Sequence, residues 1–131
     1  MHHLIIALTC LFAFNSVILG KNKIDLTALE GNYQGHVWNG GDTDPVFTVF
    51  RLTADKKLSG SYSIKEEGGI EKGTLSEFKW ESDYVLVCRW QDRYGEGTLR
   101  ILFSADLSTF RGFWGTNSET TLFQWDGAKQ L

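Results

Sequence analysis

Hydrophobic and polar residues alternate along most of the chain, and turns rich in glycine and aspartate interrupt the alternation at short intervals. A period of two places alternate side chains on opposite faces of a β-strand. Only Ile24 to Glu30 has helical spacing, through Leu26 and Leu29, and we expect a single turn there that plugs one end of the domain. The pattern otherwise predicts eight strands, over residues 31–38, 46–53, 58–65, 70–78, 83–91, 97–104, 109–115 and 121–126.

The inward faces of two predicted strands place a glycine before an aromatic residue. One strand has Gly60 before Tyr62, and another has Gly112 before Trp114. A glycine inside a strand lets the strand coil sharply, and an aromatic ring two residues further on fills the vacated space. The pattern leaves the facing of the fourth predicted strand, 70–78, ambiguous.

Eight short antiparallel strands joined by short loops are typical of an up-and-down meander. Closing such a meander into a barrel removes its exposed edges. We therefore expect an all-β, calycin-like closed barrel in preference to a two-sheet sandwich, which would show the same alternation. The interior of an eight-stranded barrel holds side chains or one small ligand.

The first twenty residues differ in composition from the rest. The stretch from Leu4 to Leu19 is nearly all apolar, and charged residues begin at Lys21. We interpret residues 1–20 as a signal peptide and residues 21–131 as a single domain that is secreted or periplasmic, with no membrane span after cleavage. An uncleaved anchor is the alternative, and lipidation of Cys10 is not expected.

One cysteine, Cys88, follows the predicted cleavage site, so an intrachain disulfide cannot form in the mature domain. It shares an alternating face with Tyr84, Leu86 and Trp90. We expect a buried, inert thiol rather than a reactive or dimer-forming one.

Charge and composition exclude several classes of function. The net charge is −3 and no basic run occurs, so nucleic-acid binding is not expected. His36 is the only histidine after the leader, and we expect it to face solvent or to have a structural role. Asn39, Asp42 and Asp44 resemble a polar turn more than a calcium loop. We therefore predict no catalytic residues, no metal and no cofactor. Four arginines are expected mostly on a solvated face: Arg89, Arg93, Arg100 and Arg111.

Aromatic residues near the predicted strand ends provide the remaining functional signal. Core packing explains most of them, but some are expected to wall a pocket at one barrel mouth. We predict a non-enzymatic domain that takes a small apolar or amphipathic ligand. An interaction module for a protein or envelope component and a hydrolase with an acidic site are the alternatives. The candidate ligand-binding residues are Tyr33, Tyr62, Trp90 and Trp114.

Two resemblances accompany these motifs. The segments 58–62, 73–75, 97–103, 110–114 and 125–127, together with Trp90, resemble an uncharacterised glycine- and aromatic-rich β module of exported bacterial proteins. Segments 31–33, 58–62 and 90–94 are similar to avidin-type calycins, and this resemblance implies that Tyr62 and Trp90 line a pocket. The end of the chain departs from the avidin pattern, which has a ligand-binding acid on its final strand, so biotin is not the expected ligand. The lipocalin start motif is approximated by Gly31 and Tyr33.

Overall fold

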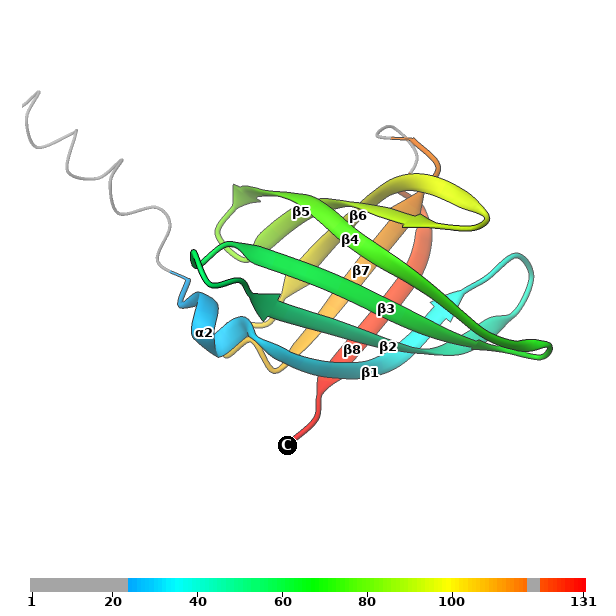
Figure 1. The fold of residues 1–131 in the computed structure, drawn as a ribbon, viewed down its shortest axis with the longest axis horizontal. Coiled ribbons are helices and arrows are strands. Elements are labelled where there is room, and N and C mark those ends of the chain that lie inside the picture. The colour runs from blue at the N-terminus through cyan, green and yellow to red at the C-terminus, as the bar shows by residue number, and fades with distance from the viewer. Residues whose placement is uncertain (1–23, 118–120) are drawn as a thin grey trace, which may run out of the picture.

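The computed structural model describes residues 24–117 and 121–131, so the predicted signal peptide lies outside the described residues. In the part of the chain that the structure describes, a short helix, α2 (Leu26–Leu29), precedes the strands (Figure 1). The strands are β1 (Gly31–Trp38), β2 (Thr43–Leu52), β3 (Leu58–Glu66), β4 (Gly69–Ser82), β5 (Val85–Asp92), β6 (Gly95–Phe103), β7 (Thr109–Gly115) and β8 (Phe123–Lys129).

The strands close into an antiparallel barrel. Each strand pairs with its neighbours in sequence, and β8 returns to pair with β1. The prediction of an all-β, up-and-down closed barrel is confirmed, and the two-sheet sandwich is not what the chain forms. Closure leaves no unpaired edge among the eight described strands, and an unpaired edge is the main hazard of a small β domain.

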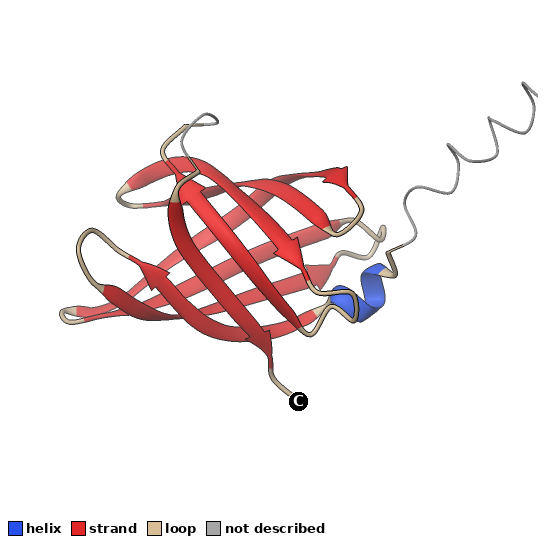
Figure 2. Cartoon of the chain, turned by 180° about the vertical axis from the view of Figure 1, so that it is seen from behind, coloured by secondary structure: helices blue, strands red, loops and turns tan. Residues whose placement is uncertain are grey.

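The two ends of the barrel differ. Helix α2 and the β2–β3 turn lie at one end, here named the closed end, and the β1–β2 and β3–β4 turns lie at the other, here named the mouth (Figures 1 and 2). The odd-numbered strands therefore run toward the mouth, and the even-numbered strands run away from it. The helical turn expected between residues 24 and 30 is present, and its Leu29 is buried in the core.

Aromatic rings fill the closed end. The ring of Tyr33 lies 5.6 Å from that of Phe50 and 5.5 Å from that of Phe110. Phe103 completes the group, 5.9 Å from Phe50 and 5.8 Å from Phe110. Edge-to-face contacts at these separations stabilise an aromatic core beyond its burial of apolar area. These rings fill the barrel interior at this end.

Tyr33 also ties the closed end together through its hydroxyl. The hydroxyl is 2.8 Å from the carbonyl oxygen of Leu29 in α2 and 3.0 Å from that of Leu107 in the β6–β7 turn. Burial raises the pKa of Tyr33 to about 12, because the phenolate would be desolvated. The ring of Tyr33 therefore packs in the core, and its hydroxyl fastens helix α2 to the closed end.

A β-bulge explains why the sequence left the facing of the fourth strand ambiguous. Ser76 pairs with Arg89 and Lys79 with Val87, so the register shifts between these pairs. Glu77 lies in the bulge with φ of +54°. Because of the extra residue, the inward positions are odd-numbered up to Leu75 and even-numbered from Phe78 onward. The strict period of two is therefore broken at the bulge.

Gly60 and Gly112 lie on inward faces, as the alternation predicted. A Cβ atom on Gly60 would lie 3.0 Å from the Cβ of Leu75. One on Gly112 would lie 2.6 Å from the carbonyl oxygen of Trp125. Both glycines therefore occupy places where a neighbouring strand leaves little room for a side chain.

Cys88 is buried on the same face of β5 as Leu86 and Trp90, as the alternation predicted. Tyr84, which was predicted to share that face, lies in the β4–β5 turn and is partly exposed. Burial also raises the pKa of the Cys88 thiol, which lowers the fraction of reactive thiolate. We expect a Cys10→Ser variant to react with a thiol reagent only after unfolding in urea. The reaction is monitored by absorbance, and rapid labelling of the folded variant would contradict the buried position of Cys88.

Candidate functional site

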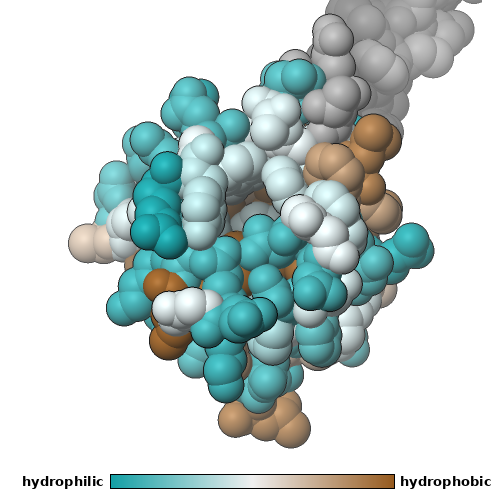
Figure 3. Space-filling model, turned by 90° about the vertical axis from the view of Figure 1, so that its right-hand side faces the viewer, coloured by the Kyte–Doolittle hydropathy of each residue, from teal (hydrophilic) through white to brown (hydrophobic). Residues whose placement is uncertain are grey.

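The mouth of the barrel contains a pocket of about 90 Å³. Seen from this end, hydrophilic residues surround a hollow in which hydrophobic surface is visible (Figure 3). Residues of the four odd-numbered strands, of β8, and of the β1–β2 and β5–β6 turns contribute the lining. The lining consists of Val37, Asn39, Tyr62, Ile64, Trp90, Asp92, Tyr94, Trp114 and Trp125.

The structure brings three of the four predicted ligand-binding residues together. Tyr62, Trp90 and Trp114 all line the pocket, whereas Tyr33 lies at the closed end. Trp90 and Trp114 meet edge to face with ring centroids 5.5 Å apart, and Tyr62 meets Trp125 in the same way at 4.8 Å. The pocket therefore has aromatic walls on several sides.

Each indole N–H of these walls is donated to another group of the protein. Trp90 Nε1 donates to the carbonyl oxygen of Gly115 at 2.9 Å, and Trp114 Nε1 donates to that of Trp38 at 3.0 Å. Trp125 Nε1 donates to Thr48 Oγ1 at 3.0 Å. The three rings are thereby held in place, and their N–H groups are not offered to the cavity.

Thr48 is the buried acceptor that positions Trp125. Thr48→Val keeps the shape of the side chain but leaves the buried indole N–H without an acceptor, so we expect a loss of about 1–3 kcal/mol in the free energy of unfolding. Thr48→Ser keeps the hydroxyl and should recover part of that loss. Urea denaturation followed by tryptophan fluorescence measures both values. Equal stability of the valine variant and the parent would show that the hydrogen bond contributes nothing.

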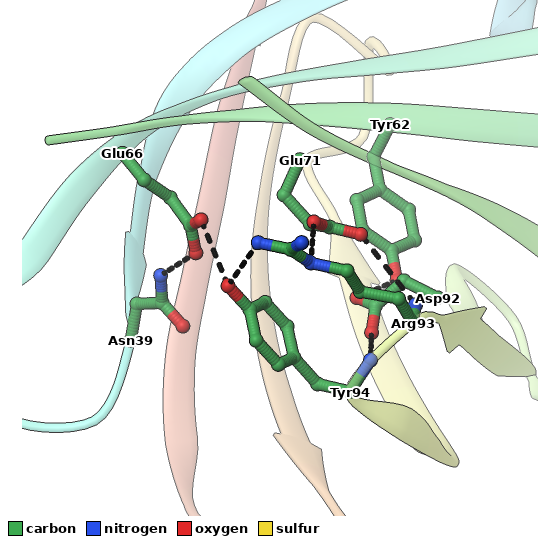
Figure 4. A network of polar contacts seen from close by, with 7 residues as sticks. All are labelled: Asn39, Tyr62, Glu66, Glu71, Asp92, Arg93 and Tyr94. Carbon is green, nitrogen blue, oxygen red and sulfur yellow. Dashed lines mark hydrogen bonds and ion pairs between the residues drawn. The ribbon is translucent and has the colours of Figure 1, made fainter. Parts of the chain in front are cut away.

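A polar network surrounds one side of the mouth (Figure 4). Arg93 Nε lies 2.7 Å from Glu71 Oε1, and Arg93 Nη2 donates to the hydroxyl of Tyr94 at 3.0 Å. That hydroxyl donates in turn to Glu66 Oε1 at 3.1 Å, and Asn39 Nδ2 donates to Glu66 Oε2 at 2.8 Å. The network links the β1–β2, β3–β4 and β5–β6 turns and so holds the mouth in one shape.

Asp92 connects this network to the pocket interior. Its Oδ2 accepts the hydroxyl of Tyr62 at 2.7 Å, and its Oδ1 accepts the backbone N–H of Tyr94 at 2.8 Å. The pKa of Tyr62 is raised, first by burial and then by the hydrogen bond and negative charge of Asp92, with a further contribution from Glu71. Tyr62 therefore acts as a neutral hydrogen-bond donor, and the carboxylates make the potential around it negative.

Other candidate residues lie away from the pocket. His36 is exposed on the outer face of β1. Arg89 pairs with Glu96 and Arg100 with Glu81 in exposed ion pairs, which contribute little to stability. Within residues 24–117 and 121–131, no group of three or more histidine, cysteine or acidic side chains is placed to hold a metal ion. The described part of the chain also contains no helix with the length and apolar character of a membrane span.

Sequence reasoning missed several lining residues, of which Asp92 and Trp125 matter most. Asp92 follows Trp90 by two residues, so the same alternation that pointed Trp90 inward also pointed Asp92 inward. Trp125 lies in the last predicted strand, 121–126, but is not among the predicted ligand-binding residues. Its inward position follows from β8, which begins at Phe123.

The comparisons with known proteins add no relative to this description. No protein-family model matches the chain, and no curated protein matches its sequence. The resemblance to exported glycine- and aromatic-rich modules and to calycins therefore stays a prediction.

Proposed function

We propose that this protein is an exported, non-enzymatic domain that binds a small apolar or amphipathic ligand in the mouth of its barrel. One contrast carries the proposal: aromatic side chains fill the barrel interior at the closed end, whereas the interior at the mouth keeps an open pocket walled by three tryptophans and two tyrosines. Pockets of this kind, mostly apolar with a few placed polar groups, are typical of small-molecule sites.

The size of the pocket limits the ligand. A single water needs about 10–15 Å³ of such a cavity. A pocket of about 90 Å³ therefore has room for only a few water-sized groups. We expect either a very small ligand or the terminal group of a larger one, whose remainder stays in solvent.

The two alternative functions have less support. An interaction module should present a contiguous apolar patch, whereas the highly exposed apolar residues Ile70, in β4, and Leu122, next to β8, belong to strands that do not pair with each other. A hydrolase needs a nucleophile or a poised acid and base, and the mouth carboxylates are engaged with Tyr62, Arg93 and Asn39. Ligand binding uses the open pocket directly.

A fragment screen by NMR tests the proposal. The library consists of neutral, anionic and cationic molecules small enough for the pocket, and the readout is the set of indole N–H signals of the five tryptophans. We expect the best fragments to shift the signals of Trp90, Trp114 and Trp125. An Ile64→Phe variant, which places a ring in the pocket, should lose the effect.

The matched control is Leu102→Phe, which adds a ring at a partly exposed position on the outer face of β6. It should leave fragment binding unchanged. If no fragment of any charge shifts the pocket tryptophans, or if Ile64→Phe binds as well as the parent, the mouth is not a ligand site.

A further inference from the structure

The hydrogen-bonding capacity of the pocket is one-sided. The side-chain donors of its lining are all used within the protein: the three indole N–H groups, the Tyr62 and Tyr94 hydroxyls, and the amide of Asn39. Asn39 donates its second N–H to Asp44 Oδ2 at 3.0 Å. An anionic ligand needs donors, and these side chains have none to spare.

Acceptors and ring surfaces are what the pocket still offers. Asp92 is the one charged side chain among the described lining residues, and no lysine, arginine or histidine is among them. A carboxylate has about four lone-pair positions, and Asp92 receives hydrogen bonds from Tyr62 and from the backbone of Tyr94. It can therefore accept further hydrogen bonds, or face a cation, without losing either partner.

The polar network at the mouth is negatively charged, as Asp92 in the pocket is. Its four carboxylates (Asp44, Glu66, Glu71 and Asp92) are accompanied by the guanidinium of Arg93, which is already paired with Glu71. Lys65 and Lys72 lie on the neighbouring strands β3 and β4, but both side chains are exposed on the outer face. Negative charge at a partly enclosed mouth attracts cations and repels anions.

The aromatic walls suit a cation as well. Trp90, Trp114, Trp125 and Tyr62 surround the cavity, and the negative face of an aromatic ring attracts an ammonium or guanidinium group within about 6 Å. Aromatic cages with a nearby carboxylate are the arrangement that recognises quaternary and methylated ammonium groups. A trimethylammonium group has four non-hydrogen atoms, which suits a pocket of about 90 Å³.

We propose that the mouth pocket selects a small organic cation, an ammonium group with a short apolar or methylated body, through Asp92 and the surrounding tryptophans. This inference rests on the proposed function, since it names the ligand class of the same pocket. Asp92 supplies the opposite charge, the rings contact the methyl groups, and the rim carboxylates raise the local concentration of cations.

Three probes of nearly the same shape test the charge preference: choline, its neutral carbon analogue 3,3-dimethylbutan-1-ol, and the anion 3,3-dimethylbutanoate. Each is titrated into the protein while the indole N–H signals are recorded. We expect choline to shift the pocket tryptophans with an affinity at least about tenfold above that of the neutral analogue, and the anion to bind more weakly than either. Raising NaCl from about 50 to about 500 mM should weaken choline binding more than binding of the alcohol.

Asp92→Asn is the decisive variant, because it removes the charge while an amide can still accept from the Tyr94 N–H and donate to the Tyr62 hydroxyl. It should lower the affinity for choline about tenfold and leave that for the alcohol nearly unchanged. Glu67→Gln makes the same change of charge at an exposed position in the β3–β4 turn and should have a much smaller effect. If the Asp92→Asn variant does not fold, Glu66→Gln at the rim provides the test. It should lower the affinity for choline more than the affinity for the alcohol.

Equal or tighter binding of the alcohol in the pocket would overturn the preference for cations while leaving the ligand site intact. Failure of all three probes to shift the pocket tryptophans would overturn the choice of this cation class, and the broader fragment screen then decides whether the mouth is a ligand site. An Asp92→Asn variant that binds choline as tightly as the parent would also overturn the proposal.

Discussion

Replacing Tyr33 by alanine should lower the free energy of unfolding by about 3–5 kcal/mol, the range for deleting a large buried aromatic side chain. Tyr33 has no exposed surface and its ring contacts Phe50, Phe103 and Phe110, so its removal leaves a cavity at the centre of the closed end. The surrounding rings come from three different strands, and they cannot collapse into the space without moving the barrel wall. Urea denaturation followed by circular dichroism measures the loss.

Tyr33→Phe separates the ring from the hydroxyl. It keeps the aromatic contacts but removes the donor that joins the carbonyl oxygens of Leu29 and Leu107. Leu107 has φ of +61°, an uncommon conformation for a residue with a side chain, and the hydrogen bond helps to hold it there. We expect a loss of about 1–3 kcal/mol for Tyr33→Phe.

The control is Phe47→Ala, which deletes a partly exposed ring on the outer face of β2 and should cost less than about 1 kcal/mol. A Tyr33→Ala variant no less stable than this control would mean that the closed end is not packed as described.

The same hydroxyl makes stability sensitive to alkali. The pKa of Tyr33 is raised to about 12 in the folded protein, from an ordinary value of 10.0, so folding favours the neutral form. The stabilisation from neutral Tyr33 is complete below pH 10 and is lost as the pH rises toward 12. The advantage of the parent over Tyr33→Phe should therefore shrink across this interval. Tyr62 is present in both proteins, so its own raised pKa does not affect the difference.

Alternation along the sequence predicted the strands well because each residue's facing is decided locally. The ranges Gly31–Trp38 and Thr109–Gly115 agree with β1 and β7. The bulge at Glu77 could not be found in this way, since one added residue changes the facing of everything after it. Closure of the barrel also depends on the pairing of β1 with β8, which joins residues about ninety positions apart and leaves no local signal.

The pocket was predicted in part because alternation gives the face of a residue but not its height along the barrel axis. Height follows from strand direction. In a meander, Tyr33 comes early in a strand that starts at the closed end, whereas Trp90 comes late in a strand that ends at the mouth. Trp125, early in a strand that starts at the mouth, belongs with Trp90 for the same reason. Applied to the predicted meander, this rule would have excluded Tyr33 and included Asp92. It would not have found Trp125, which comes late in the predicted strand 121–126 and early only in the observed β8.

Gly35 lies at the seam between β1 and β8, where the two backbones come close together. The pairs Gln34 with Ala128 and Val37 with Trp125 bracket this glycine. A Cβ atom on Gly35 would lie 1.9 Å from the carbonyl oxygen of Asp126 and 2.9 Å from the Cα of Gly127. Both contacts are with backbone, which cannot move aside as a side chain can. The two strands would have to separate at the seam that closes the sheet.

We therefore expect Gly35→Ala to lower the free energy of unfolding by about 3 kcal/mol or more, at or above the usual upper limit for overpacking. Gly68→Ala is the matched control, because a Cβ atom there meets no atom within 4 Å, and it should change stability by less than about 0.5 kcal/mol. Denaturation midpoints in urea, recorded side by side with the parent, measure both changes. If Gly35→Ala were as stable as Gly68→Ala, the backbones of β1 and β8 could not approach each other as closely as they do here, and closure of the barrel through this register would be wrong.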